Sequence, residues 1–231
     1  MDNWMPLVEY VVRWGHYLFG ITWIGLLYYF NFVQGGYMAA ASDEAKVDAF
    51  TKLVPSALWW FRFGAMFTFL TGLILIAFIL HGGAQGAGLL TALTVDIVLA
   101  ALMATLMFLN VWLIIWPNQK VVIASNESVR DGGEADPNAA GSAAKALLAS
   151  RTNTFFSAPM LFLMGSHGHF ALGAPDVDTG WSAQALIIGL VIIAIIEANA
   201  IWGKTMVLTT VRGVITSSLV LTVVMAVVAS L

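Results

Sequence analysis

The chain alternates between long apolar runs and shorter polar connections. Each run is about as long as the ~20 residues that an α-helix needs to cross the hydrocarbon core of a bilayer. The runs cover roughly 7–33, 57–80, 89–116, 152–172, 181–203 and 208–230. They are continuous rather than alternating, which favours helices over the strands of a membrane barrel. The pattern therefore predicts an all-α, polytopic membrane bundle of about six transmembrane helices, forming one transmembrane domain over residues 1–231.

The longest polar connection covers residues 117–150. Its stretch NESVRDGGEADPNAAGSAAKALLAS mixes glycine, alanine and charged residues, a composition typical of a loop. We expect a loop there, with at most a short helix at the membrane interface.

Lysine and arginine gather on one side of the predicted bundle. Nine of the ten basic residues flank the first, third and fifth connections, and these are Lys46, Lys52, Arg62, Lys120, Arg130, Lys145, Arg151, Lys204 and Arg212. Cytoplasmic loops carry an excess of lysine and arginine. We therefore expect both termini outside, in a multi-pass protein of the bacterial inner (cytoplasmic) membrane. The fourth connection, with Asp176 and Asp178, is expected to lie outside and to help dock a basic partner.

Composition narrows the chemistry that the bundle can hold. Sixty per cent of the residues are hydrophobic and only 10% are charged, which is typical of an integral membrane protein surrounded by lipid. The chain has no cysteine, which excludes disulfides, cysteine-ligated zinc or iron–sulfur clusters, and covalently attached c-type haem. The net charge is −3 and the basic residues are scattered, so we expect no nucleic-acid partner.

The four histidines, His16, His81, His167 and His169, all fall in the outer half of the predicted membrane. An ionisable group inside a span costs on the order of 3 kcal/mol on insertion scales, so it usually faces a cavity, a partner or a cofactor. Imidazoles that converge from different helices are typical of b-type haem and, less often, of copper. All four are candidate ligands of iron, and we expect one haem b. A second haem, held by His81 and His169, stays open.

The first predicted helix carries Glu9, Arg13, His16, Gly20 and Trp23 on one stripe. Gly20 would let a flat ring approach the backbone near His16, and Arg13 could pair with haem propionates. In the competing interpretation, Glu9 and Arg13 form an i,i+4 ion pair at the interface. That interpretation explains the two charges but not the histidine.

The fourth predicted helix offers the second ligand. His167 and His169 are two residues apart, so they point to roughly opposite sides of a helix. His167 is the first choice and His169 the second. His81, beside Gly82, could also be a simple interfacial residue.

Other buried polar residues carry less weight as site candidates. They are Asp96, Glu197, Asn199 and Arg212. An ion pair between Glu197 and Arg212 is slightly favoured over a proton path or a quinone contact.

Four segments together resemble a known family. They are WGHYLFGITWIGLLYYFNFVQ (14–34), WWFRFGAMFTFLTG (59–72), LMFLNVWLIIWPNQK (106–120) and NTFFSAPMLFLM (153–164). These segments resemble the membrane domain of the cytochrome-c-linked bacterial urate hydroxylases, also called the urate oxidase N-terminal domain family. The similarity covers predicted helices one to four and is weak over the last two. HYLFGITWIGLLYYFNF is also distantly similar to haem-b membrane protoporphyrinogen oxidases, in which a first-helix histidine ligates haem.

The resemblance implies oxidation of a purine-type substrate, with electrons passed to a c-type cytochrome. Such family members carry a C-terminal cytochrome c domain, whereas this chain has no C-x-x-C-H. We therefore expect a cytochrome b-like electron-transfer subunit that works between a substrate-oxidising partner, or quinol, and a separate periplasmic cytochrome c. The alternative is an oxidoreductase that itself oxidises urate or a related purine.

Overall fold

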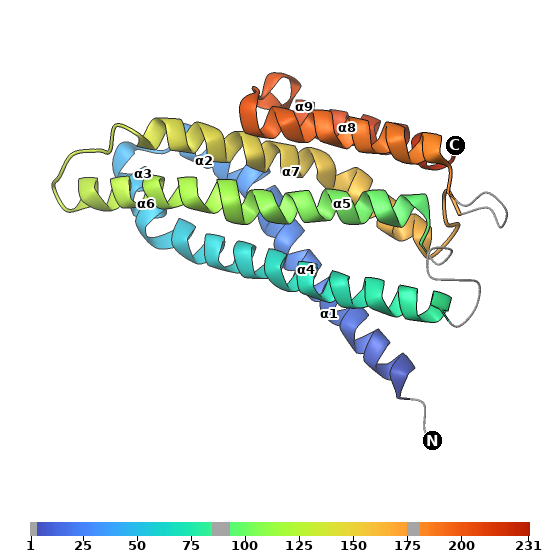
Figure 1. The fold of residues 1–231 in the computed structure, drawn as a ribbon. Helices are drawn as coiled ribbons and strands as arrows, with labels where there is room; N and C mark the ends of the chain where they lie inside the picture. Colours follow the sequence, from blue (N-terminus) through green and yellow to red (C-terminus); the bar gives the residue numbers. More distant parts are fainter. Residues whose placement is uncertain (1–3, 85–92, 175–180) are drawn as a thin grey trace.

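The computed structural model describes residues 4–84, 93–174 and 181–231, and the elements in these ranges are all helical. Figure 1 shows them side by side as a bundle. The α-helices are α1 (Met5–Tyr28), α2 (Gly35–Ala40), α3 (Asp43–Asp48), α4 (Val54–Ala84), α5 (Val95–Leu109), α6 (Trp116–Arg130), α7 (Ala139–His167), α8 (Ala183–Trp202) and α9 (Val211–Ala229). The predicted all-α class is confirmed.

Short segments with wider turns join several of these helices into longer rods. The π-helical segments are η1 (Tyr29–Gln34), η2 (Ala49–Leu53) and η3 (Asn110–Ile115), and a 3₁₀ turn, η4 (Met206–Thr209), precedes α9. The described chain therefore forms rods over 5–40, 43–84, 95–130, 139–167, 183–202 and 211–229. Within the described ranges, four helical segments are long and apolar enough to cross a membrane: Asp43–Gly82, Val95–Arg130, Ala183–Trp202 and Val211–Ala229.

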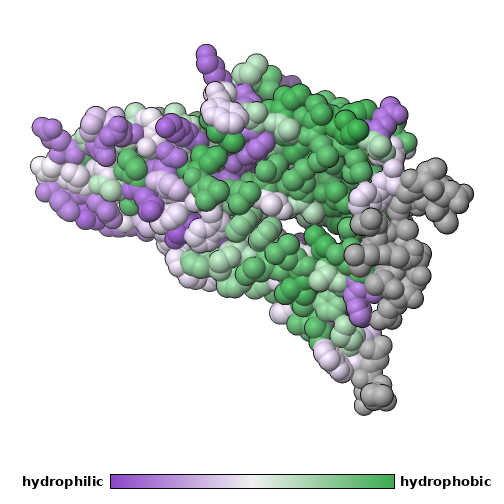
Figure 2. Space-filling model, in the orientation of Figure 1, coloured by the Kyte–Doolittle hydropathy of each residue, from purple (hydrophilic) through white to green (hydrophobic). Residues whose placement is uncertain are grey.

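The two ends of the bundle differ in chemistry. Both chain termini lie at one end, which we call the terminal end (Figure 1). The opposite end, which we call the basic end, holds the connections that carry most of the lysine and arginine. Figure 2 shows hydrophilic side chains gathered at the basic end and hydrophobic side chains over the middle of the bundle.

The predicted loop over 117–150 is wrong, because most of it is helical. α6 continues to Arg130 and α7 begins at Ala139, which leaves only 131–138 between them. Hydropathy detects only the lipid-length part of a helix, and these two helices continue beyond it by packing on each other. The buried residues of this contact are Val122 and Ile123 on α6 and Ala146, Leu148 and Ala149 on α7. The polar connection predicted around 35–55 is likewise mostly helical, with a turn capped by the Ser42 hydroxyl.

The fourth predicted span, 152–172, ends earlier than expected. α7 stops at His167, and residues 172–173 run beside the start of α5, where Val95 N donates to the Gly173 carbonyl at 3.0 Å. Gly173 has a φ of +67°, and a Cβ there would lie 2.5 Å from the Ala229 carbonyl oxygen. Only glycine fits this close approach without strain.

α1 and α4 pack closely against each other. A Cβ added to Gly64 would lie 3.2 Å from the backbone nitrogen of Trp23, and one added to Gly72 would lie 3.3 Å from His16 Cε1. Small residues allow membrane helices to approach closely, since lipid provides no hydrophobic drive for their association. The pair also contacts α5 and α7, through the stacked rings of Phe69 and Phe108 and through the Tyr28 and Ser157 hydroxyls. Figure 2 shows the surface hollowed between the lower part of the molecule and the body above it.

Replacing Gly64 with leucine should force α1 and α4 apart. We expect Gly64→Leu to reduce the free energy of unfolding by about 1–3 kcal/mol, because the nearest atom is the Trp23 backbone nitrogen, which cannot move aside as a side chain could. Gly25→Leu is the matched control, because a Cβ at Gly25 meets nothing within 4 Å. Thermal unfolding of both variants in detergent measures the effect, and equal melting temperatures would contradict it.

Candidate functional site

A cavity of about 750 Å³ lies between α1, α4, α5 and α7. Its walls are mainly apolar, with Ile24, Ile76, Ala104 and Met160 among the lining residues. Its polar groups include the histidines near the terminal end. A largely apolar cavity with a few polar groups at one end is the usual form of a cofactor or small-molecule site.

Five of the six residues predicted to form the site line this cavity. They are Arg13, His16, Gly20, His167 and His169. The sixth, His81, is an exposed residue in the last turn of α4 and is not among the lining residues. The structure therefore places His16 and the two histidines at the α7 end on the walls of one cavity, but it does not place His81 beside His169 there.

His16 is held on α4 by a threonine. Its Nδ1 lies 3.0 Å from Thr71 Oγ1, and that hydroxyl lies 2.6 Å from the Phe67 carbonyl oxygen. A carbonyl can only accept, so the Thr71 hydrogen points to Phe67 and the Thr71 oxygen accepts from His16 Nδ1–H. Nε2 is then the nitrogen with an available lone pair.

His167 and His169 follow the same arrangement. His169 Nδ1 lies 2.8 Å from the Gly165 carbonyl oxygen, so it donates, and in the neutral imidazole Nε2 is again the nitrogen with the lone pair. His167 Nδ1 lies 2.8 Å from Thr94 Oγ1, and Thr94 in turn donates to Asp96. Each cavity histidine thus has its Nδ1 occupied by a partner, the state in which Nε2 can bind a metal.

Arg13 forms an ion pair on its own helix. Its Nη2 lies 2.6 Å from Glu9 Oε1, and both side chains are more than 40% exposed. The i,i+4 pair of the competing interpretation is therefore present, and Arg13 lines the cavity as well. Gly20 also lines the cavity, and a Cβ there would lie 4.0 Å from the Thr68 methyl group, an ordinary contact.

A second polar cluster lies deeper in the bundle. Asn110 Nδ2 donates to Asn153 Oδ1 at 3.0 Å and to Glu197 Oε2 at 3.2 Å, while Asn153 Nδ2 donates to the Met107 carbonyl at 2.9 Å. The cluster joins α5, α7 and α8 at the start of the η3 segment. The expected Glu197–Arg212 ion pair is absent from the described residues, because Glu197 is bound by Asn110 and Arg212 is exposed.

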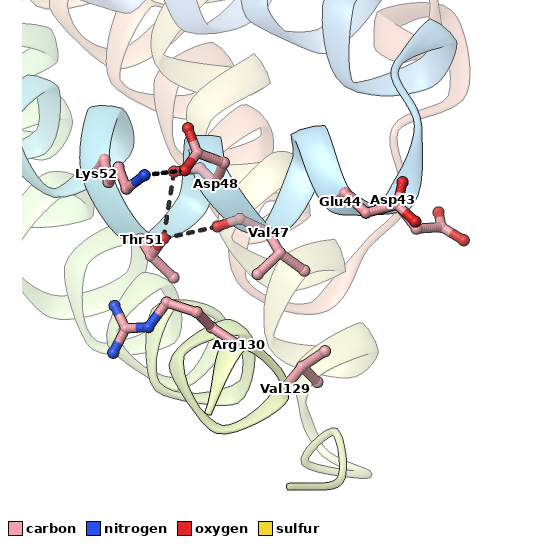
Figure 3. A pocket seen from close by; sticks show the side chains of 8 residues that line it. All are labelled: Asp43, Glu44, Val47, Asp48, Thr51, Lys52, Val129 and Arg130. Atoms are coloured by element: carbon pink, nitrogen blue, oxygen red, sulfur yellow. Dashed lines mark hydrogen bonds and ion pairs between the residues drawn. The ribbon is translucent and has the colours of Figure 1, made fainter. Parts of the chain in front are cut away.

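A smaller hollow of about 420 Å³ lies at the basic end, between α3 with η2 and the end of α6. Figure 3 shows Lys52 directed towards Asp48 and the Thr51 hydroxyl directed towards the backbone. The Arg130 guanidinium is hydrogen-bonded to Asp131 and lowers the pKa of that carboxyl. These charges neutralise one another locally.

Sequence reasoning did not identify the threonines that orient the histidines. Thr71 lies on α4 and Thr94 just before α5, so each contacts its histidine only after the helices pack. Asp96 was given low weight, although it is buried beside His167. Among the residues that the structure describes, there is no group of three or more His, Cys, Asp or Glu side chains able to hold a metal ion.

A family model described as "Urate oxidase N-terminal" matches residues 87–230. The match includes α5 to α9, and with them His167 and His169, but it does not include α1 or His16. It also includes the last two helices, for which the sequence resemblance was considered weak. No curated protein and no solved structure matches the chain.

Asn153 is expected to matter for stability more than a typical buried polar residue. Asn153→Leu would remove the acceptor of one Asn110 side-chain N–H bond and the side-chain donor to the Met107 carbonyl, at a cost of about 1–3 kcal/mol in the free energy of unfolding. Thr105→Val is the control, because the Thr105 hydroxyl donates only to the Ala101 carbonyl of its own helix. Denaturation in mixed micelles should give a lower unfolding midpoint for Asn153→Leu than for Thr105→Val. Similar midpoints would contradict a stabilising role of the cluster.

Proposed function

This chain belongs to the urate oxidase N-terminal family, and from that premise we propose that it is a haem-b-binding electron-transfer subunit of a membrane oxidoreductase. It passes electrons between a substrate-oxidising partner, or quinol, and a periplasmic c-type cytochrome. The observation that carries this proposal is the cavity that His16, His167 and His169 all line, each with Nδ1 already hydrogen-bonded. Axial ligation of haem needs one or two imidazoles in this form.

The residues of the cavity fit a haem b in three respects. The walls are apolar, the volume suits a cofactor, and the imidazoles come from helices on two sides. Arg13 adds a cation near the terminal end for propionates, because the Glu9 ion pair engages only one of its guanidinium nitrogens. A haem held there would supply one-electron chemistry. His16 and His167 are the proposed ligands, with His169 as the alternative to His167.

Electron exchange is proposed to occur at the terminal end. The cavity histidines lie near that end, whereas the basic end would be about a bilayer's thickness, ~30 Å, away. A periplasmic cytochrome could approach there if the terminal end faces outside. The acidic residues proposed to dock it, Asp176 and Asp178, lie outside the described residues.

The family description favours a second candidate, in which the bundle itself oxidises urate or a related purine and a separate cytochrome c accepts the electrons. The same cavity would then admit the substrate. Urate-dependent reduction of soluble cytochrome c by the purified protein is the measurement that separates the two functions, since a relay needs a partner that holds the substrate site.

A reduced-minus-oxidised absorption spectrum tests the haem. We expect the purified protein to show the α-band of low-spin haem b, and His16→Ala to lose most of it because an axial ligand is gone. His81→Ala is the matched control and should keep the band, because His81 does not line the cavity. A band that persists in His16→Ala, or a wild-type protein without one, would rule out the proposed ligation. His167→Ala and His169→Ala then identify the second ligand.

We further propose that all six rods cross the bacterial inner membrane with both termini outside, supported by the basic residues at one end. The native chain has no cysteine, so single cysteines report cleanly. In intact cells, a membrane-impermeant thiol reagent should label Ala174→Cys at once. Glu134→Cys should react only after the membrane is permeabilised. The reverse pattern would invert the topology.

A further inference from the structure

Asp96 is a carboxylate with no exposed surface in the first turn of α5. Its Oδ1 accepts from the Ile97 N–H at 2.7 Å and from the Thr94 hydroxyl. Its Oδ2 accepts from the Leu172 N–H at 2.9 Å and from the Ser166 hydroxyl at 2.6 Å, whose hydrogen is shared with the Leu163 carbonyl at 2.9 Å. Four donated hydrogen bonds are what an ionised carboxylate needs when water is excluded.

The basic group that faces this carboxylate is a histidine. Among the ion pairs of the described residues, Asp96 appears only with His167, whose Nδ1 lies 3.8 Å from Asp96 Oδ1. Thr94 stands between them: its oxygen is 2.8 Å from His167 Nδ1, and its hydrogen points to Asp96. The hydrogen bonds therefore run in one direction, from the imidazole N–H to the hydroxyl and from the hydroxyl to the carboxylate.

In the hydrogen bonds of the described residues, the partners of the other two cavity histidines lead to main-chain carbonyls and not to a carboxylate. The Thr71 hydroxyl that accepts from His16 donates onward to the Phe67 and Thr68 carbonyls. His169 donates directly to the Gly165 carbonyl. The three imidazoles share one tautomer, but only His167 is connected to a carboxylate.

We propose that Asp96, acting through Thr94, is a positioning residue that fixes His167 as the Nδ1–H tautomer and makes its Nε2 a stronger electron donor to a ligated metal. The second half of this statement rests on the proposed haem site. A carboxylate behind a metal-ligating histidine increases the basicity of the ligand, and a more basic axial ligand stabilises oxidised iron. Asp96 would thus lower the reduction potential of a haem bound by His167.

The tautomer is tested without haem. Full-length apoprotein carrying ¹⁵N-histidine is studied in detergent, and the His167 signals are assigned by their loss in His167→Gln. In the wild type, His167 should be the Nδ1–H tautomer. Thr94→Val, which removes the hydroxyl but keeps the shape, should give a mixture of tautomers, and Thr94→Ser should restore the single form. A wild-type Nε2–H tautomer, or no change in Thr94→Val, would overturn the proposal.

The electronic effect is tested by redox titration of the haem-loaded protein. Thr94→Val and Asp96→Asn should both shift the midpoint potential upward, with Thr94→Ser close to the wild type. Thr71→Val is the matched control: it removes the corresponding hydroxyl behind His16, which has no carboxylate, and should shift the potential less. If Thr94 only supports the structure, Thr94→Val would bind less haem, but its midpoint potential would not rise above that of Thr71→Val.

The outcomes separate this inference from the proposed function. If the wild type binds haem but Thr94→Val shifts the potential no more than Thr71→Val does, the role of Asp96 is wrong and the haem site stands. If the wild type shows no haem band, the proposed function fails, and the tautomer measurement still decides whether Asp96 positions His167.

Discussion

A polar side chain inside a lipid-crossing bundle must find its hydrogen-bond partner within the protein, because hydrocarbon offers none. In this structure that constraint converges on α7, whose stretch 151–160 is almost entirely buried. The Tyr28 and Ser157 hydroxyls lie 2.9 Å apart and tie α1 to α7, and Asn153 ties α5 to it. Ser218 donates to the Phe155 carbonyl at 2.8 Å and ties α9 to it. α7 is therefore held from several sides by bonds that fix its rotation.

The fixed rotation of α7 decides what its terminal end presents to the cavity. His167 and His169 lie at that end. The residue just before His167, Ser166, is hydrogen-bonded to Asp96. On the opposite wall, α1 and α4 approach closely at Gly64 and Gly72, and His16 lies against the second of these glycines. The cavity lies between the closely packed pair α1 and α4 on one side and α5 and α7, which are joined by polar side-chain bonds, on the other. Its histidines are thus positioned by two separate packing arrangements.

Each histidine of the cavity is oriented by a group that belongs to the scaffold and not to a ligand. His16 is oriented by Thr71, whose hydroxyl donates to a carbonyl of its own helix. His169 is oriented by a main-chain carbonyl, and His167 by Thr94, which is bonded to a buried carboxylate. Such support lowers the cost of binding a metal, because the imidazoles need no reorientation. The two proposed haem ligands therefore differ: His167 is connected through Thr94 to the Asp96 carboxylate, whereas His16 is connected through Thr71 to a main-chain carbonyl.

The sequence by itself determined the helical class, the segregation of basic residues to one end, the family, and five residues that line one cavity, because hydropathy, charge and ionisable residues in apolar runs leave local signals. It could not determine that residues 117–150 are mostly helix, since a polar helix stabilised by packing has no apolar run to reveal it. It also missed Thr71 and Thr94, gave Asp96 little weight, and paired Glu197 with Arg212 instead of Asn110. Tertiary structure alone decided these points. Which hydroxyl lies beside which imidazole depends on the rotation and depth of two packed helices, and that geometry is set by contacts between residues far apart in the chain.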